Sequence, residues 1–97
     1  MLYTILAYDK DNSLDLRLKT RESHLEYLKK FLSNIIFAGP LLNNDEKPIG
    51  SQLILNFDTQ TELDSFLQND PYAVANLFAK TIIHPVKMVI NNSEIKV

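Results

Sequence analysis

Residues 51–71 read SQLILNFDTQTELDSFLQNDP, a strand pattern followed at once by a helix pattern. Apolar side chains recur at every second position up to Phe57, as one face of a strand requires. The tetrapeptide Thr59-Gln60-Thr61-Glu62 then fits a capping box, which predicts that a helix begins there. Asn69-Asp70-Pro71 is predicted to end that helix.

The chain before this stretch predicts a strand, a helix and a second strand. Leu2 to Tyr8 is a short apolar and aromatic run, typical of a strand. Leu14 to about Leu32 has helical spacing, and its leucines are predicted to form one buried stripe. Ile35 to Ala38 is predicted to be a strand that Gly39-Pro40 stops. The stripe consists of Leu14, Leu18, Leu25, Leu28 and Leu32.

After the second helix, Tyr72 to Phe78 predicts a short helical piece and Thr81 to Ile90 a last strand. Pro85 interrupts this strand, and because proline lacks the ladder N–H, the strand is predicted to lie at an edge or to carry a bulge. The order strand, helix, strand, strand, helix, strand predicts a ferredoxin-like α+β fold. In this βαββαβ arrangement a four-stranded antiparallel sheet carries both helices on one face. We expect one domain over residues 1–97.

The predicted strands carry apolar residues on both faces. Leu2 and Leu6 fall on one side of the first strand, and Tyr3 and Ile5 on the other. Helices on one face of the sheet leave the second face bare, and a bare apolar face of that size is unusual in a monomer. We therefore expect a homodimer in which a second copy packs sheet against sheet.

Composition excludes several classes of function. The net charge of −2, without a basic cluster, argues against nucleic-acid binding. The chain has no cysteine, which excludes disulfides and thiolate catalysis, and its two histidines lie far apart, so we expect no metal site. No apolar run approaches the ~20 residues that span a bilayer, and the N-terminus lacks the features of a signal peptide. We expect a cytoplasmic protein.

Arg17, Arg21 and His24 form one row beside the leucine stripe. Arginines so close to a buried edge need anionic partners, which could be a ligand or carboxylates such as Asp9. His24 could take and return a proton, or it could be a packed histidine with only a structural role. The structural alternative for the arginines is that they extend to water and pair with acidic neighbours.

Asp70 precedes a proline, which makes it a good N-cap for the following helical piece. A capping carboxylate stays ionised and could at the same time orient an imidazole. Tyr72 could donate a hydrogen bond to a ligand or merely pack, and Ser51 could bind a ligand or a backbone group. We do not expect Ser51 to be a nucleophile, because it lacks the strand-to-helix elbow.

Four pieces of the chain together resemble the YciI-like (YCII-related) family. They are Arg17-Leu18-x-x-Arg21-x-x-His24-Leu25-x-Tyr27-Leu28, Ala38-Gly39-Pro40-Leu41, Pro48-Ile49-Gly50-Ser51 and Asn69-Asp70-Pro71-Tyr72-x-x-Ala75-x-Leu77-Phe78. The resemblance implies a ferredoxin-like fold of the dimeric α+β barrel superfamily and a histidine–aspartate pair in a cleft, here His24 and Asp70. One characterised relative eliminates chloride from a chlorinated hydroquinone, and the superfamily includes muconolactone isomerase. The chain departs from the family at His84-Pro85-Val86, where many relatives have arginine, proline and tryptophan.

The first functional hypothesis is a cofactor-independent lyase or isomerase with His24 and Asp70 as the catalytic pair. Arg17 and Arg21 would hold a small anionic or cyclic substrate, with hydrogen bonds from Ser51 and Tyr72. The second hypothesis is a non-catalytic dimer that binds a small anionic metabolite. The third is a purely structural role for the same residues.

Overall fold

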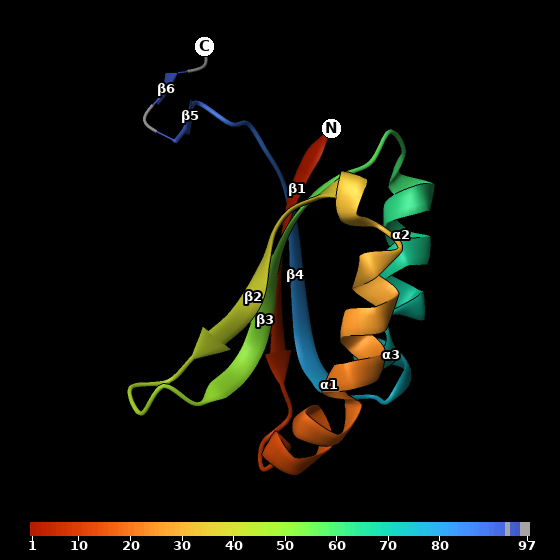
Figure 1. Cartoon of the computed structure of the whole chain (residues 1–97), viewed down its shortest axis with the longest axis vertical. Coiled ribbons are helices and arrows are strands. Elements are labelled where there is room, and N and C mark those ends of the chain that lie inside the picture. The colour runs from red at the N-terminus through yellow and green to blue at the C-terminus, as the bar shows by residue number, and fades with distance from the viewer. Residues whose placement is uncertain (93, 96–97) are drawn as a thin grey trace.

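The computed structural model describes residues 1–92 and 94–95. Its first four strands form an antiparallel sheet in the order β2-β3-β1-β4, and all helices lie on one face of that sheet (Figure 1). This confirms the predicted ferredoxin-like α+β fold. The elements are β1 (Leu2–Asp9), α1 (Leu14–Lys29), the 3₁₀ turn η1 (Leu32–Asn34), β2 (Ile35–Leu42), β3 (Pro48–Asn56), α2 (Gln60–Asn69), α3 (Pro71–Val74), β4 (Phe78–Val86), β5 (Ile90–Asn91) and β6 (Glu94–Ile95).

The core lies between the sheet and the helices. Tyr3 and Ile5 of β1 pair with Leu55 and Leu53 of β3, and these four side chains point toward the helices and are buried. From the other side, α2 buries Leu63 and Phe66, the two apolar positions that its helical period brings together. The core cluster consists of Tyr3, Ile5, Leu28, Leu53, Leu55, Phe57, Leu63 and Phe66.

The second face of the sheet is apolar as well. The register pairs Leu2 with Val86, and Leu6 with Ile82. Paired residues of neighbouring strands share a face, so these four side chains lie on the side away from the helices. No described helix covers this outer face (Figure 1).

The two edge strands differ from the predicted bounds. Strand β2 runs through Gly39 and Pro40 to Leu42 instead of stopping at Ala38, because at the edge a proline costs no ladder hydrogen bond on its free side. Strand β4 begins at Phe78 and ends at Val86, earlier than predicted at both ends. The prediction from Pro85 is confirmed, since β4 pairs only with β1 and is an edge strand.

The prediction of a buried leucine stripe on α1 is wrong. Leu18 is 56% exposed and Leu32 is 68% exposed, and Leu32 lies beyond the helix, which ends at Lys29. The buried side chains of α1 are Arg17, His24 and Leu28. Polar side chains can occupy the buried face because each has a charged or hydrogen-bonding partner there. The helical period of the sequence does not reveal these partners, so it cannot predict which face is buried.

Both predicted helix caps are confirmed. The Thr59 hydroxyl accepts a hydrogen bond from the Glu62 N–H at 3.2 Å, and α2 follows. The Asp70 carboxylate accepts one from the Tyr72 N–H at 2.9 Å and begins α3. Helix α3 is only four residues long, shorter than the predicted piece from 72 to 78, because Phe78 already belongs to β4. None of the described helices is long and apolar enough to cross a membrane.

Candidate active site

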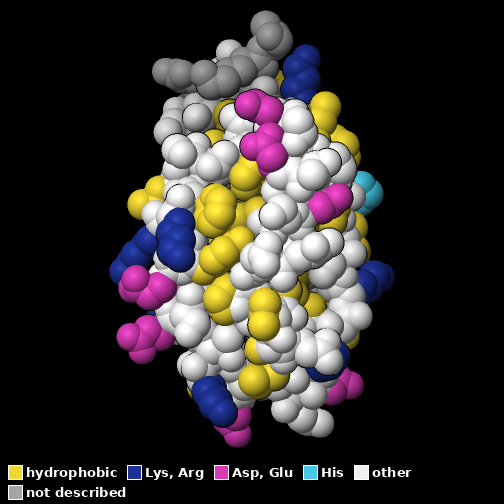
Figure 2. Space-filling model, turned by 90° about the vertical axis from the view of Figure 1, so that its right-hand side faces the viewer, with side chains coloured by type: hydrophobic (Ala, Val, Ile, Leu, Met, Phe, Trp, Pro, Cys, Tyr) yellow, Lys and Arg dark blue, Asp and Glu magenta, His cyan; other side chains and the backbone are white. Residues whose placement is uncertain are grey.

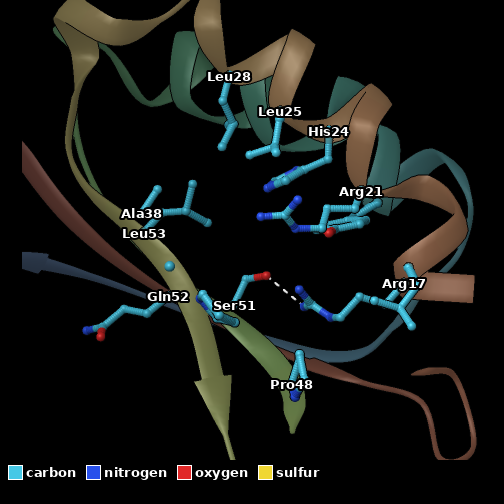
Figure 3. A pocket seen from close by; sticks show the side chains of 14 residues that line it. Arg17, Arg21, His24, Leu25, Leu28, Ala38, Pro48, Ser51, Gln52 and Leu53 are labelled. Carbon is cyan, nitrogen blue, oxygen red and sulfur yellow. Dashed lines mark hydrogen bonds between the residues drawn. The ribbon is translucent and has the colours of Figure 1, made fainter. Parts of the chain in front are cut away.

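A cavity of about 270 Å³ lies between α1 and the strands β2 and β3 (Figure 3). All four pieces of sequence that carried the family resemblance contribute to its lining. These pieces lie far apart in the chain, with Arg17 and Tyr72 separated by 55 positions, and the antiparallel sheet with its covering helices brings them together. The lining residues are Arg17, Leu18, Arg21, His24, Leu25, Leu28, Ala38, Gly39, Pro40, Pro48, Ser51, Gln52, Leu53 and Tyr72.

The predicted approach of His24 and Asp70 is confirmed, with Nδ1 of His24 lying 2.8 Å from Oδ1 of Asp70. Both side chains are buried. Helix α1 supplies the histidine, and the residue that caps α3 supplies the carboxylate. The contact falls within the hydrogen-bond range of about 2.6–3.2 Å that a general base and its orienting partner need.

The hydrogen bonds of Asp70 determine the tautomer of His24. Oδ1 accepts the N–H of Tyr72, and because an ionised carboxylate can only accept hydrogen bonds, Nδ1 of His24 acts as the donor in the second bond. Nε2 then carries the free lone pair of the neutral ring. Among the described residues, every fully buried side-chain nitrogen has a hydrogen-bond partner, whereas Nε2 of His24 has no such partner. Nε2 is therefore not fully buried, and it is open to the cavity that His24 lines.

The Tyr72 ring contacts two side chains of α1. It stacks on His24 with ring centroids 3.9 Å apart and planes inclined by 18°, and the Arg17 guanidinium carbon lies 4.6 Å from its centroid. Burial raises the pKa of Tyr72, although Arg17 and Arg21 act to lower it. The hydroxyl therefore stays protonated near neutral pH and can donate a hydrogen bond.

Arg17 is held by two other elements of the fold. Its Nε and Nη2 donate to the two carboxylate oxygens of Asp9 at 2.7 and 3.0 Å, and Nη2 also donates to the Ser51 hydroxyl at 2.8 Å. Arg17 is thus buried and paired with Asp9, one of the carboxylates considered above, and does not extend to water. Since an arginine only donates, the Ser51 oxygen is the acceptor, and its own proton remains available.

Arg21 extends toward the middle of the cavity (Figure 3). It is exposed, and within residues 1–92 and 94–95 it makes no ion pair. Part of the cavity lining is apolar, and it includes Leu18 and Leu25 of α1 and Leu53 of β3. Sequence reasoning missed this apolar lining because it assigned the leucines of α1 to the core. Apolar side chains also reach the surface between charged ones on the helical side (Figure 2).

Gly50 allows β1 and β3 to approach closely next to Ser51. A Cβ atom at Gly50 would lie 2.4 Å from the carbonyl oxygen of Ala7 on β1. The glycine therefore fixes the position of the strand that carries the Ser51 hydroxyl.

His84 takes no part in the site, because its register partner Thr4 places it on the outer face of the sheet. The described residues contain no group of three acidic or histidine side chains that could hold a metal ion.

Comparison with known proteins identifies the family. The model of the YCII-related domain matches residues 1–87. An uncharacterised protein of Haemophilus influenzae is 35% identical over 97 residues, covering 92% of this chain and 99% of that protein. Protein YciI of Escherichia coli O6:H1 is 31% identical with the same coverage.

A solved structure with a bound ligand is also similar. It is 5-chloro-2-hydroxyhydroquinone dehydrochlorinase from Burkholderia phenoliruptrix AC1100 in complex with 2,5-dihydroxybenzoquinone. The two chains superpose with a TM-score of 0.84 and are 36% identical, over 90% of this chain and 94% of the dehydrochlorinase.

Proposed function

The chain belongs to the YCII-related domain family, and on that premise we propose that it is a small enzyme of the lyase or isomerase type. It uses His24 and Asp70 for general acid–base chemistry on a small anionic or cyclic organic substrate. The observation that carries the proposal is the 2.8 Å contact between His24 Nδ1 and Asp70 at the wall of a cavity. The similarity to a dehydrochlorinase supports it.

In the proposed reaction, Nε2 of His24 removes a proton from an activated C–H or O–H group of the substrate. Asp70 holds the imidazole in the required tautomer and stabilises the imidazolium that forms. In a lyase, the electron pair left on the substrate then expels a leaving group such as chloride. In an isomerase, His24 returns the proton to a different atom. Neither route needs a cofactor.

Oxygen that becomes negative during this step is stabilised by donors that line the cavity. Arg21 supplies an unpaired positive charge, and Ser51 and Tyr72 supply hydroxyl protons. Arg17 has its charge balanced by Asp9, so it contributes mainly by holding Ser51 and Tyr72 in position. This division of roles differs from the equal roles that the sequence suggested for the two arginines.

The reaction is tested with 5-chloro-2-hydroxyhydroquinone, by measuring the release of chloride at saturating substrate. We expect turnover that falls by roughly 10²–10⁴ in His24→Gln, the range that a general base contributes. Lys19→Gln is the control, since Lys19 is exposed on α1 and does not line the cavity, and it should keep the wild-type rate.

The alternative function, a module that binds a small anion without converting it, predicts a different result. The wild-type protein would then bind 2,5-dihydroxybenzoquinone but turn over none of a panel of halogenated and enolisable ring compounds. Equal turnover in wild type and His24→Gln would instead remove the histidine from the mechanism.

The proposal includes a homodimer in the cytoplasm. A second copy covers the outer sheet face, whose apolar residues include Leu6 and Ile82. Burial of this face between two copies is favourable, because apolar surface removed from water stabilises by roughly 25 cal/mol per Å².

A further inference from the structure

The charged groups around the cavity are balanced when His24 is neutral. Arg17 is paired with Asp9, and Asp70 accepts a hydrogen bond from His24. The remaining charge among the lining residues is Arg21. Two guanidinium groups therefore face two carboxylates, and the cavity has no net charge until His24 takes up a proton.

We infer that the cavity selects a small weak organic acid in its singly charged anionic form and takes it up together with one proton, which resides on His24. The proton makes the site positive by one charge, which one negative charge on the ligand then balances. A ligand anion in a cavity of about 270 Å³ that is partly apolar needs such a partner, because an unpaired charge is costly to remove from water. This inference rests on the proposed role of the cavity as a ligand site, but it does not require turnover.

The hydrogen-bonding groups of the cavity suit an anionic oxygen. Once protonated, His24 offers Nε2–H toward the cavity while Nδ1–H remains bound to Asp70. The Ser51 hydroxyl, whose oxygen accepts from Arg17, can direct its proton to the same ligand. Tyr72 stays neutral because burial raises its pKa, so it is a further donor. The apolar part of the cavity lining, which includes Leu25, favours a ring on the rest of the ligand.

The groups that face His24 come from every element around it. Helix α1 contributes Arg17 and Arg21, and strand β1 contributes Asp9, which is paired with Arg17. The start of α3 contributes Asp70 and Tyr72. The parts of β2 and β3 that line the cavity carry no titratable side chain, since they supply Ala38, Gly39, Pro40, Pro48, Ser51, Gln52 and Leu53. Among these types of side chain, imidazole is the one that ordinarily changes its charge near neutral pH.

The test uses 4-nitrophenol as the probe, at about pH 8.5, where the free probe is anionic and an ordinary imidazole is neutral. Calorimetric titration in buffers of different ionisation enthalpy gives the number of protons taken up on binding. We expect about one proton for the wild type, an affinity that falls about tenfold per pH unit, and a bound probe with the visible absorbance of the phenolate. Nitrobenzene, which has the same ring without the acidic hydroxyl, should bind without proton uptake.

Variants assign the proton and the charge. His24→Gln should abolish the proton uptake, whereas Lys19→Gln should leave it unchanged. Arg21→Gln should weaken phenolate binding by about tenfold or more. Lys19 is an exposed neighbour on α1 that does not line the cavity, so Lys19→Gln should not weaken phenolate binding. Asp9→Asn removes a negative charge, so it should reduce the proton uptake and strengthen binding at high pH, an effect that loss of structure would not produce.

Failure of this inference can be told from failure of the proposed function. Binding without proton uptake, or no binding of 4-nitrophenol by the folded wild type, would overturn the inference, while turnover of a substrate would still support the enzyme. Proton uptake of about one without any turnover would support the inference and leave the cavity as a binding site.

Discussion

One oxygen of Asp70 serves both His24 and the backbone of α3. Oδ1 accepts from His24 Nδ1 at 2.8 Å and from the Tyr72 N–H at 2.9 Å. The capping and orienting roles, which the sequence analysis expected to be able to coexist, are thus geometrically compatible. The start of α3 also places Tyr72 against the His24 ring, so the cap and the stack hold the same imidazole.

Substitutions at Asp70 should separate the cap from the pair. Asp70→Ser keeps an N-cap oxygen but is too short to reach the imidazole, whereas Asp70→Ala loses both. We expect Asp70→Ser to retain about 0.5–2 kcal/mol more unfolding free energy than Asp70→Ala, the usual value of an N-cap. Both variants should lose the turnover that depends on His24. Urea unfolding measures the first effect, and equal stabilities would show that the cap contributes nothing.

The ion pair between Arg17 and Asp9 should contribute to stability chiefly by avoiding an unpaired buried charge. The side chains are only 5% and 7% exposed. Arg17→Met leaves the Asp9 carboxylate buried without its partner, so we expect a loss of about 3–5 kcal/mol in unfolding free energy at neutral pH.

The double variant Asp9→Asn with Arg17→Met is the control for this prediction. It removes the uncompensated charge and should recover part of the lost stability. A loss below about 1 kcal/mol in Arg17→Met, the level of a surface pair, would contradict the prediction.

The order of elements, the edge position of β4 and both helix caps follow from local chemistry and could therefore be predicted. The face of α1 that is buried could not, because Arg17 and His24 become buried only through Asp9 and Asp70, which are distant in space until the chain folds. For the same reason the sequence missed the bond from Arg17 to Ser51, which joins residues 34 positions apart.

Two tyrosines, the buried Tyr72 and the partly buried Tyr27, should make the protein sensitive to alkali. Burial raises the pKa of Tyr72 and of Tyr27, and the nearby Asp70 carboxylate raises the pKa of both further. A raised pKa in the folded state leaves stability unchanged below the ordinary tyrosine value of about 10 and lowers it as the pH rises through the folded value. Urea unfolding between about pH 8 and 11 measures this loss. It should be smaller in the double variant Tyr27→Phe with Tyr72→Phe, and an identical loss would contradict the assignment.

Gly50 should tolerate no larger side chain. Gly50→Ala places a Cβ atom 2.4 Å from the Ala7 carbonyl oxygen, which belongs to the backbone of the neighbouring strand. We expect a loss of at least about 2 kcal/mol, because β1 and β3 must move apart. Gly39→Ala is the matched control, since its new Cβ meets only the Phe37 side chain at 3.2 Å. Equal losses from the two substitutions would show that strand approach is not the cause.

The apolar outer face should hold two copies of the chain together. Leu6 and Ile82 are paired neighbours on this face, so Leu6→Glu places a charge in the middle of the proposed interface. We expect sedimentation equilibrium to give twice the chain mass for the wild type and the single chain mass for Leu6→Glu. Val74→Glu is the control, because Val74 is 70% exposed on α3, on the helical side of the sheet. A monomeric wild type at micromolar concentration, or equal dissociation of both variants, would mean that the outer face is covered by something other than a second copy.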